Sequence, residues 1–187
     1  MENANYQKEI LNQTGLEMLN LSISQLKKAT EAFINHDSDL AEEVIYTEAH
    51  VNALDIKIEK DCERFIALFN PVASDLRFIM AVLKINIELE RIADHAYGIS
   101  KYIVDIDQKI NPKLFDSFKF HKMNETVLAM FENITIAYEE KDVKVARKVF
   151  KKDKILDKIN AESFMIVEEE LKKNTSTIKQ ILLIFAV

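Results

Sequence analysis

The stretch AFINHDSDLAEEVIYTEAHVNALD, residues 32–55, returns 105 residues later as AYEEKDVKVARKVFKKDKILDKIN, residues 137–160. Apolar positions of one stretch match apolar positions of the other, and Asp37 matches Asp142 between two helical patterns. The polar positions correspond as well, in three pairs: Glu48 with Asp153, Asn52 with Asp157, and Asp55 with Asn160. This period is far longer than that of common solenoids, so the repeat predicts a duplicated helical bundle.

The composition favours long helices throughout the chain. Only two Gly and two Pro occur in 187 residues, of which 48% are hydrophobic and 30% charged, leaving few turns for a sheet. Apolar residues at helical spacing predict six helices, over 4–34, 38–69, 74–104, 115–140, 142–172 and from 176 onward. We therefore predict an all-α fold of two tandem three-helix bundles, comprising residues 1–108 and residues 109–187.

Polar and Pro-containing breaks separate the predicted helices. A residue within 37–39 is expected to cap the second helix. Pro71 excludes a continuous helix through the next break, where Ser74 is expected to cap the third helix. The longest stretch without periodicity, DIDQKINPKLFD at 105–116, is the predicted domain boundary.

Charge and motif content exclude several classes of protein. A net charge of −6 argues against nucleic-acid binding, which needs clustered Lys and Arg. The single Cys62 permits no internal disulfide and suits a reducing compartment. Two Gly are too few for a phosphate-binding loop or a nucleophile elbow, and no Glu-x-x-His pair supports a ferritin-like di-iron site. No secretory signal is recognised, and no apolar run reaches the ~20 residues needed to span a bilayer.

Acidic side chains interrupt the apolar faces of two predicted helices. On the second helix, Glu48 and Asp55 fall inside the stripe expected to face the core, and Asn52 lies on its flank. The third helix has two apolar faces, and one of them continues into Glu90 and Asp94. The apolar members of that face are Leu76, Ile79, Leu83 and Ile87.

The fifth predicted helix repeats this arrangement. Its apolar stripe consists of Val145, Val149, Leu156 and Val167. Asp153 and Asn160 fall inside the stripe and Asp157 lies beside it. Acids of the second bundle are therefore expected to face the core as well.

Burying an unpaired carboxylate costs several kcal/mol, so these acids need a cation, a proton or a strong donor. Three interpretations stay open: a metal site, a buried network with Lys or Arg, and a solvated groove. The ligand set of a metal site in the first bundle would be Glu48, Asn52, Asp55, Glu90 and Asp94. These oxygen ligands, without a thiol, suit a hard or borderline divalent or trivalent cation.

The stretch PVASDLRFIMAVLKINIELERIADHAYGI, residues 71–99, resembles the signature of the PhoU family, the regulators of bacterial phosphate uptake. LERIADHA, residues 89–96, is the most specific part. The resemblance extends over most of the chain and implies a duplicated three-helix bundle. It also implies metal sites, because family members hold iron, zinc or other metal ions through Glu/Asp-x-x-x-Asp motifs on the bundle surface.

Carried over to this sequence, the motif falls on three pairs: Glu90 with Asp94, Glu48 with Asn52, and Asp153 with Asp157. The pair of Glu48 and Asn52 is degenerate because Asn replaces the second acid, and Asp55 is placed to compensate. The resemblance implies iron or zinc as the cofactor, with manganese, magnesium and nickel as alternatives.

The resemblance implies a regulator and not an enzyme, with no catalytic residues. Such a protein connects a phosphate transporter at the cytoplasmic membrane with a sensor histidine kinase, and keeps the phosphate-starvation response off when phosphate is plentiful. It would be cytoplasmic and peripheral to the inner membrane when bound to these partners. Two alternatives are an accessory of a sodium–phosphate cotransporter and a metal-dependent phosphatase. Family members often form dimers, and a third helix with two apolar faces also favours a homodimer.

The C-terminal part departs from the family pattern. Aligning IMAVLKI, residues 79–85, with QILLIFAV, residues 180–187, by their apolar runs puts the counterpart of Glu90 near position 191. The resemblance therefore implies a second bundle that is truncated at its C-terminal end. A metal site around Asp153 and Asp157 would then lack half of its ligands.

Overall fold

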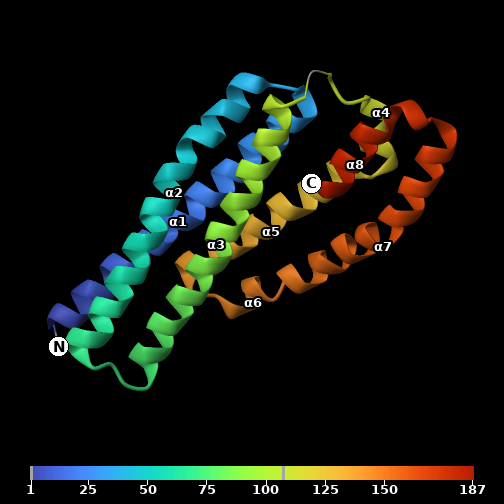
Figure 1. The fold of residues 1–187 in the computed structure, drawn as a ribbon. Coiled ribbons are helices and arrows are strands. Elements are labelled where there is room, and N and C mark those ends of the chain that lie inside the picture. The colour runs from blue at the N-terminus through green and yellow to red at the C-terminus, as the bar shows by residue number, and fades with distance from the viewer. Residues whose placement is uncertain (1, 107) are drawn as a thin grey trace.

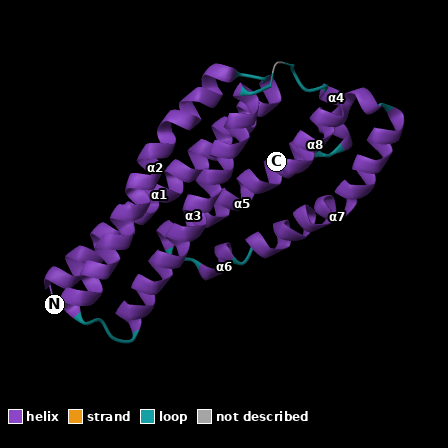
Figure 2. Cartoon of the chain, viewed as in Figure 1, coloured by secondary structure: helices purple, strands orange, loops and turns teal. Residues whose placement is uncertain are grey.

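The computed structural model describes residues 2–106 and 108–187, and this part of the chain contains helices and turns but no strand (Figures 1 and 2). The elements are α1 (Glu2–Asn35), α2 (Ser38–Phe69), α3 (Ser74–Val104), α4 (Pro112–Ser117), α5 (Phe120–Glu140), α6 (Val143–Ala146), α7 (Val149–Lys173), the 3-10 helix η1 (Thr175–Thr177) and α8 (Ile178–Ala186). The predicted all-α fold is confirmed.

Three long helices, α1, α2 and α3, pack side by side along most of their lengths (Figure 1). The apolar stripe predicted for α2 is confirmed, because its members Val44, Val51, Ile58, Cys62 and Phe65 are all buried. Burial raises the pKa of the Cys62 thiol to about 11, and the nearby acids add to the increase. Cys62 is thus a small core residue with a protonated thiol at neutral pH.

The two apolar faces predicted for α3 differ in burial. Ile79 is fully buried, but Leu76 is 40% and Ile87 is 50% exposed. α1 and α2 contact α3 on one side only, along the face that carries Leu89, Ala93 and other buried residues. The second face therefore remains at the surface of the described chain.

Asp37 and Asp142 occupy equivalent turns, as their repeat positions predict. Each follows a residue in the left-handed conformation, with φ of 58° and 55°. Each donates its backbone N–H to the carbonyl oxygen five residues earlier, at 3.0 and 3.1 Å. Each also accepts a backbone N–H of the next helix through Oδ1, at 3.0 and 2.7 Å. Both carboxylates therefore cap a helix N-terminus, and the cap expected within 37–39 is Asp37.

The expected cap at Ser74 is wrong. Ser74 is the first residue of α3, and the capping position belongs to Ala73, which has no side-chain acceptor. Ala73 has φ 47° and ψ −108°, a conformation that costs free energy in a residue with a Cβ. The turn after Pro71 tightens through a hydrogen bond from Asp75 N to Val72 O (3.2 Å), so the helix begins one residue earlier than a Ser74 cap requires.

Two helices predicted to be continuous are interrupted. The predicted helix 115–140 is split at Lys119, which is left-handed with φ 54°. Phe118 and Phe120 on either side of it are both buried, so the break lets the two aromatic residues that flank Lys119 enter the same core. The predicted helix 142–172 is interrupted at Arg147 and Lys148, between α6 and α7.

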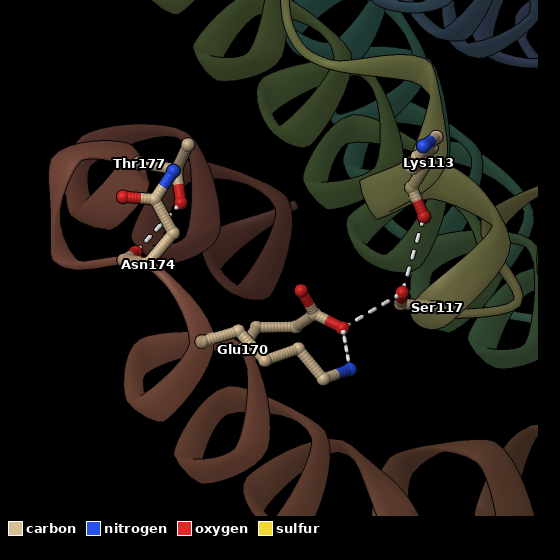
Figure 3. A network of polar contacts seen from close by, with 6 residues as sticks. Lys113, Ser117, Glu170, Asn174 and Thr177 are labelled. Carbon is tan, nitrogen blue, oxygen red and sulfur yellow. Dashed lines mark hydrogen bonds and ion pairs between the residues drawn. The ribbon is translucent and has the colours of Figure 1, made fainter.

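Aromatic residues connect the second set of helices to the first, and one polar network joins two helices within the second set. The ring centroid of Phe33 on α1 lies 5.7 Å from that of Phe115 and 5.4 Å from that of Phe120. Figure 3 shows the network that joins α4 to α7, in which Ser117 Oγ lies 3.0 Å from Glu170 Oε1 and 3.1 Å from Lys113 O. Lys173 donates to Glu170 at 2.8 Å, and these contacts hold the pKa of that carboxyl below its usual range.

A cavity of about 530 Å³ opens between α1, α3, α5, α7 and α8, and its lining is largely apolar. The nine residues of α8 contact α7 and α4 only locally, whereas the 31 residues of α3 pack along both of their partners. The second set of helices is therefore less densely packed than the first. The division into domains at 108/109 stays a prediction, and Asp107 within the predicted boundary stretch lies outside the described residues.

The two glycines offer a matched test of the contact between α1 and α5. A methyl group added at Gly98 meets no atom within 4 Å, so Gly98→Ala should stabilise the fold by up to about 1 kcal/mol through helix propensity. A methyl group at Gly15 collides with Tyr138 Oη, whose hydroxyl donates to Asn12 O (3.3 Å). We expect Gly15→Ala to be less stable than Gly98→Ala by at least about 1 kcal/mol in urea unfolding.

Removal of the Tyr138 hydroxyl supplies the control for this comparison. In a Tyr138→Phe background the collision is absent, because the next ring atom lies 3.4 Å from the new methyl carbon. The penalty of Gly15→Ala should then shrink. An equal penalty in both backgrounds would contradict the packing of Tyr138 against Gly15.

Candidate acidic site on α2 and α3

Five carboxylates gather on adjacent turns of α2 and α3, which run antiparallel to each other (Figure 1). We call this surface the acidic face, and it consists of Glu48, Asp55, Glu59, Glu90 and Asp94. Spacings of seven and four residues place the members of α2 on one side of that helix, and the four-residue spacing of Glu90 and Asp94 does the same on α3. Acids of the two helices lie near one another, such as Glu48 with Asp94 and Glu90 with Asp55, while the predicted ligand set as a whole stays a prediction.

Glu48 is half-buried on α2 and lies beside Asp94 of α3. Burial is the main cause that raises the pKa of Glu48, and the charge of Asp94 adds to the increase. Glu90 adds a smaller repulsion, while Asn52 one turn along α2 acts in the opposite direction. Like charges without a compensating cation thus surround this carboxyl.

Glu90 occupies the centre of the acidic face. Burial again is the first cause that raises its pKa, followed by the charges of Asp94 and Asp55. Arg91, its neighbour in the chain, lowers the pKa, but it is a weaker influence than either acid. The guanidinium of Arg91 instead pairs with Glu88 at 2.9 Å on the exposed side of α3.

Asp55 is held by Asn86, a residue that the sequence analysis did not single out. The Asn86 amide donates to Asp55 Oδ1 at 2.6 Å and lies 3.3 Å from the Asp55 backbone oxygen. Burial raises the pKa of Asp55, and this hydrogen bond partly offsets the increase. Asn86 is only 2% exposed, and its own Oδ1 has no hydrogen-bond partner among the described residues. It therefore fixes the position of one acidic side chain.

Both overlooked residues had a signal in the sequence. Asn86 lies between Val82 and Leu89 at spacings of four and three, so it occupies the buried face of α3 as a polar exception. Glu59 continues the spacing of Glu48 and Asp55 by one further turn, and its charge contributes to the raised pKa of Glu90. Periodicity alone would have found both.

The bases near the acidic face are engaged elsewhere. Lys57 of α2 lies 3.8 Å from Asp61 and 3.3 Å from the Thr14 hydroxyl. Within residues 2–106 and 108–187, none of the carboxylates of the acidic face forms an ion pair with Lys or Arg. The interpretation as a buried Lys or Arg network is therefore wrong for the described chain.

The acidic face fits a cation by charge and by ligand type, since it offers several carboxylate oxygens with raised pKa values. In the part of the chain that is described, however, no three His, Cys, Asp or Glu side chains stand close enough together to form a complete metal-binding group. The acids meet in pairs along the two helices. Metal binding by these residues stays a prediction.

Asp153 and Asp157 of α7 are both exposed, together with Asn160. The expectation that Asp153 faces the core is wrong, because α7 buries the side centred on Ile159 and turns Asp153 outward. Asn160 is exposed but lines the cavity between the helices. α7 packs against α5 and α8, and neither aspartate contributes to the pKa shifts of the acidic face. Their role as metal ligands also stays a prediction.

Among the helices that the structure describes, none combines the length and the apolar composition needed to cross a bilayer. Charged residues recur along all of the long helices, including those with apolar stripes.

Comparison with known proteins confirms the family inferred from residues 71–99. The PhoU domain family model matches residues 16–103 and 120–187. The phosphate-specific transport system accessory protein PhoU homolog of Aquifex aeolicus is 35% identical over 144 residues, which are 77% of this chain and 64% of the relative. The chain thus spans just under two thirds of the length of that relative.

Solved structures agree with this assignment. The crystal structure of PhoU from Pseudomonas aeruginosa superposes with a TM-score of 0.91 at 26% identity, over 97% of this chain and 87% of the other. The phosphate transport system regulatory protein PhoU from Streptococcus pneumoniae gives a TM-score of 0.78 at 25% identity, over 98% and 88%.

The raised pKa values predict a pH dependence of stability. A folded pKa above the usual 4.5 of Glu means that the folded state binds protons more tightly, so stability falls as pH rises from about 4.5 through the folded pKa. Glu48→Gln removes one such charge. In chelator, it should raise the free energy of unfolding at about pH 7, and the gain should vanish below about pH 4.

The control is Glu17→Gln, which neutralises an exposed carboxylate on α1. The free energy of unfolding of the wild type and of both variants is measured with urea at the two pH values. A Glu48→Gln gain that is equal at both pH values, or no larger than that of the control, would contradict the repulsion at the acidic face.

Proposed function

Because the chain belongs to the PhoU family, we propose that it is a metal-binding regulatory accessory of a phosphate transport system. The names of its relatives, a phosphate-specific transport system accessory protein and a phosphate transport system regulatory protein, support this role. In the proposed role it acts as a negative regulator of phosphate uptake and of phosphate-starvation signalling, without catalysing a reaction.

One observation supports metal binding above all others: the acidic face concentrates carboxylates on two helices without a basic partner. Glu48, Asp55 and Glu90 have raised pKa values, so each is destabilised as an anion by its surroundings. A cation with oxygen ligands relieves that cost, and iron or zinc is the proposed ion. Asn52, exposed one turn from Glu48, offers a neutral oxygen at the edge of the face.

The proposed partners are a phosphate transporter and a sensor histidine kinase at the cytoplasmic membrane. The protein would be cytoplasmic and join the inner membrane as a peripheral subunit of these partners. We also propose a homodimer, because the second apolar face of α3 is exposed at Leu76 and Ile87.

Metal content tests the proposed site directly. Protein purified without chelator and without a metal-affinity tag should contain iron or zinc by elemental analysis, and Glu90→Ala with Asp94→Ala should lose it. Added metal should raise the Tm of the wild type by linkage and leave that of the double variant unchanged. In chelator the double variant should be at least as stable as the wild type, because repulsion is removed.

Glu9→Ala with Glu17→Ala provides the control, since it removes two exposed carboxylates from α1. This variant should retain both the metal and the Tm response. A wild type that contains no metal and whose Tm does not respond to iron, zinc or manganese would refute the metal site.

Regulation is tested in a bacterial strain that lacks its own family member and carries a reporter of the phosphate-starvation response. We expect the chain to restore repression of the reporter at high phosphate, and Glu90→Ala with Asp94→Ala to restore it at least several-fold less well. Equal protein levels are verified by immunoblot. A reporter that stays fully active despite stable wild-type protein would contradict the proposed negative regulation.

A further inference from the structure

α7 carries large exposed apolar side chains on the side opposite its buried residue Ile159. Phe150 is 70%, Phe164 69% and Met165 60% exposed. Lys154 and Lys158 are exposed between them. These five residues fall within roughly 120° of the helix circumference, at 100° per residue. We call the five residues the basic–apolar face of α7; the exposed Asp157 lies in the same arc and reduces its positive charge.

The charge around this face is strongly positive. The segment 143–158 contains seven basic and two acidic residues, in a chain whose net charge is −6. Among the described residues, Lys154 forms no ion pair, and Lys158 has a single loose one with Glu162 at 4.0 Å. In Figure 1, α7 runs along the edge of the molecule away from α1 and α2, and most of this face is exposed in the described chain. Phe185 of α8 contacts it at Phe164, with ring centroids 5.0 Å apart.

α3 shows the complementary pattern on its unpacked side. Leu76 is 40%, Met80 44% and Ile87 50% exposed, and the same side continues into Glu90 and Asp94. We call these five residues the acidic–apolar face of α3. Its carboxylates lack a basic partner, and its apolar part lacks a covering helix within the described chain.

The two faces also match in spacing. On α3 the centre of the apolar part, at residue 81, precedes the centre of the acidic pair by eleven residues, or ~16 Å along the helix. On α7 the two lysines precede Phe164 and Met165 by eight to nine residues, or ~13 Å. The order is reversed, so antiparallel packing brings Phe164 and Met165 against the apolar residues of α3 and the lysines against its carboxylates; Phe150, one turn before the lysines, lies outside this match. The flexible Lys side chain spans the remaining difference.

We propose that the acidic–apolar face of α3 in one copy binds the basic–apolar face of α7 in a second copy. In the proposed dimer a two-fold axis pairs each face with its complement, so the contact forms twice and the assembly closes. The inference rests on the proposed homodimer and not on the proposed metal binding. In this contact Glu90 and Asp94 have a second type of partner, because the ammonium groups of Lys154 and Lys158 take the place of a metal ion.

Charge reversal tests the contact. Sedimentation equilibrium in EDTA compares the wild type with Glu90→Lys/Asp94→Lys and with Lys154→Glu/Lys158→Glu. Each variant alone should raise the dimer Kd at least ~10-fold, because both contacts then oppose like charges. An equimolar mixture of the two variants should recover a dimer of wild-type Kd, because every contact in the mixed dimer pairs opposite charges.

Glu9→Lys/Glu17→Lys is the control, since it reverses two charges on α1, and its Kd should stay at the wild-type value. Recovery in the mixture also shows that both variants are folded. If Glu90→Lys/Asp94→Lys fails to fold by circular dichroism, Glu90→Gln/Asp94→Asn replaces it and should raise the Kd by a smaller factor.

Four results would overturn the inference. A wild type that is monomeric at micromolar concentration would remove the homodimer and the contact together. A dimer that tolerates both reversals, or a mixture that fails to recover, would remove the contact alone. A monomeric wild type that sediments with phosphatidylglycerol vesicles, and loses this with Lys154→Glu/Lys158→Glu, would assign the α7 face to a lipid surface instead.

Discussion

The packing of α3 between α1 and α2 determines the rest of the molecule. One face of α3, from Ile79 to Ile103, is buried by its two partners, and burial of each large aliphatic side chain on it contributes about 1.5–3 kcal/mol. A helix can bury only one such face against two neighbours on the same side. The opposite side therefore stays at the surface with Glu90 and Asp94. Because α2 is the adjacent helix, its own acids are brought beside them.

This arrangement separates the stability of the bundle from the chemistry of its surface. The core between α1, α2 and α3 is apolar except for a few residues such as Asn86, which holds Asp55 from within. The acidic face remains free of ion pairs in the described chain, so its charges repel one another. The cost is tolerated because the carboxylates are only partly buried, and it makes the face receptive to any cation, whether metal or ammonium.

Charge is also distributed unevenly along the chain. The first three helices carry the uncompensated acids, whereas the segment 143–158 carries an excess of Lys and Arg. Such separation within a chain of net charge −6 creates regions of opposite potential, which orient an approaching partner. The exposed apolar residues beside each region then supply contact area.

Periodicity and repetition predicted the features that depend on local sequence. The equivalent turns at Asp37 and Asp142 follow from a cap that acts within one turn, and the buried stripe of α2 follows from regular spacing. The breaks at Lys119 and before α7 could not be predicted, because no Gly or Pro marks them and tertiary packing of Phe118 and Phe120 selects the first.

At the candidate site, too, the sequence predicted what depends on helical spacing but not what depends on tertiary packing. Helical phase placed Glu48, Asp55, Glu90 and Asp94 on facing sides, since α2 and α3 are consecutive and must be antiparallel. Phase did not show that nearby Lys57 and Arg91 pair elsewhere, because this depends on side-chain conformation. It also misplaced Asp153, since the interruption before α7 and the burial of Ile159 set which side of that helix faces inward.

The uneven depth of the core has a consequence for how the molecule opens. α2 and α3 each bury a full stripe of residues, whereas among the described residues α7 has one buried residue, Ile159, and α6 has none. Amide protons of α6 and α7 are therefore protected by few apolar contacts, and exchange with solvent there requires only a sub-global opening. Those of α1, α2 and α3 exchange through disruption of the larger core. Unfolding is accordingly expected to proceed in two cooperative units, with the helices that carry the excess of basic residues released first.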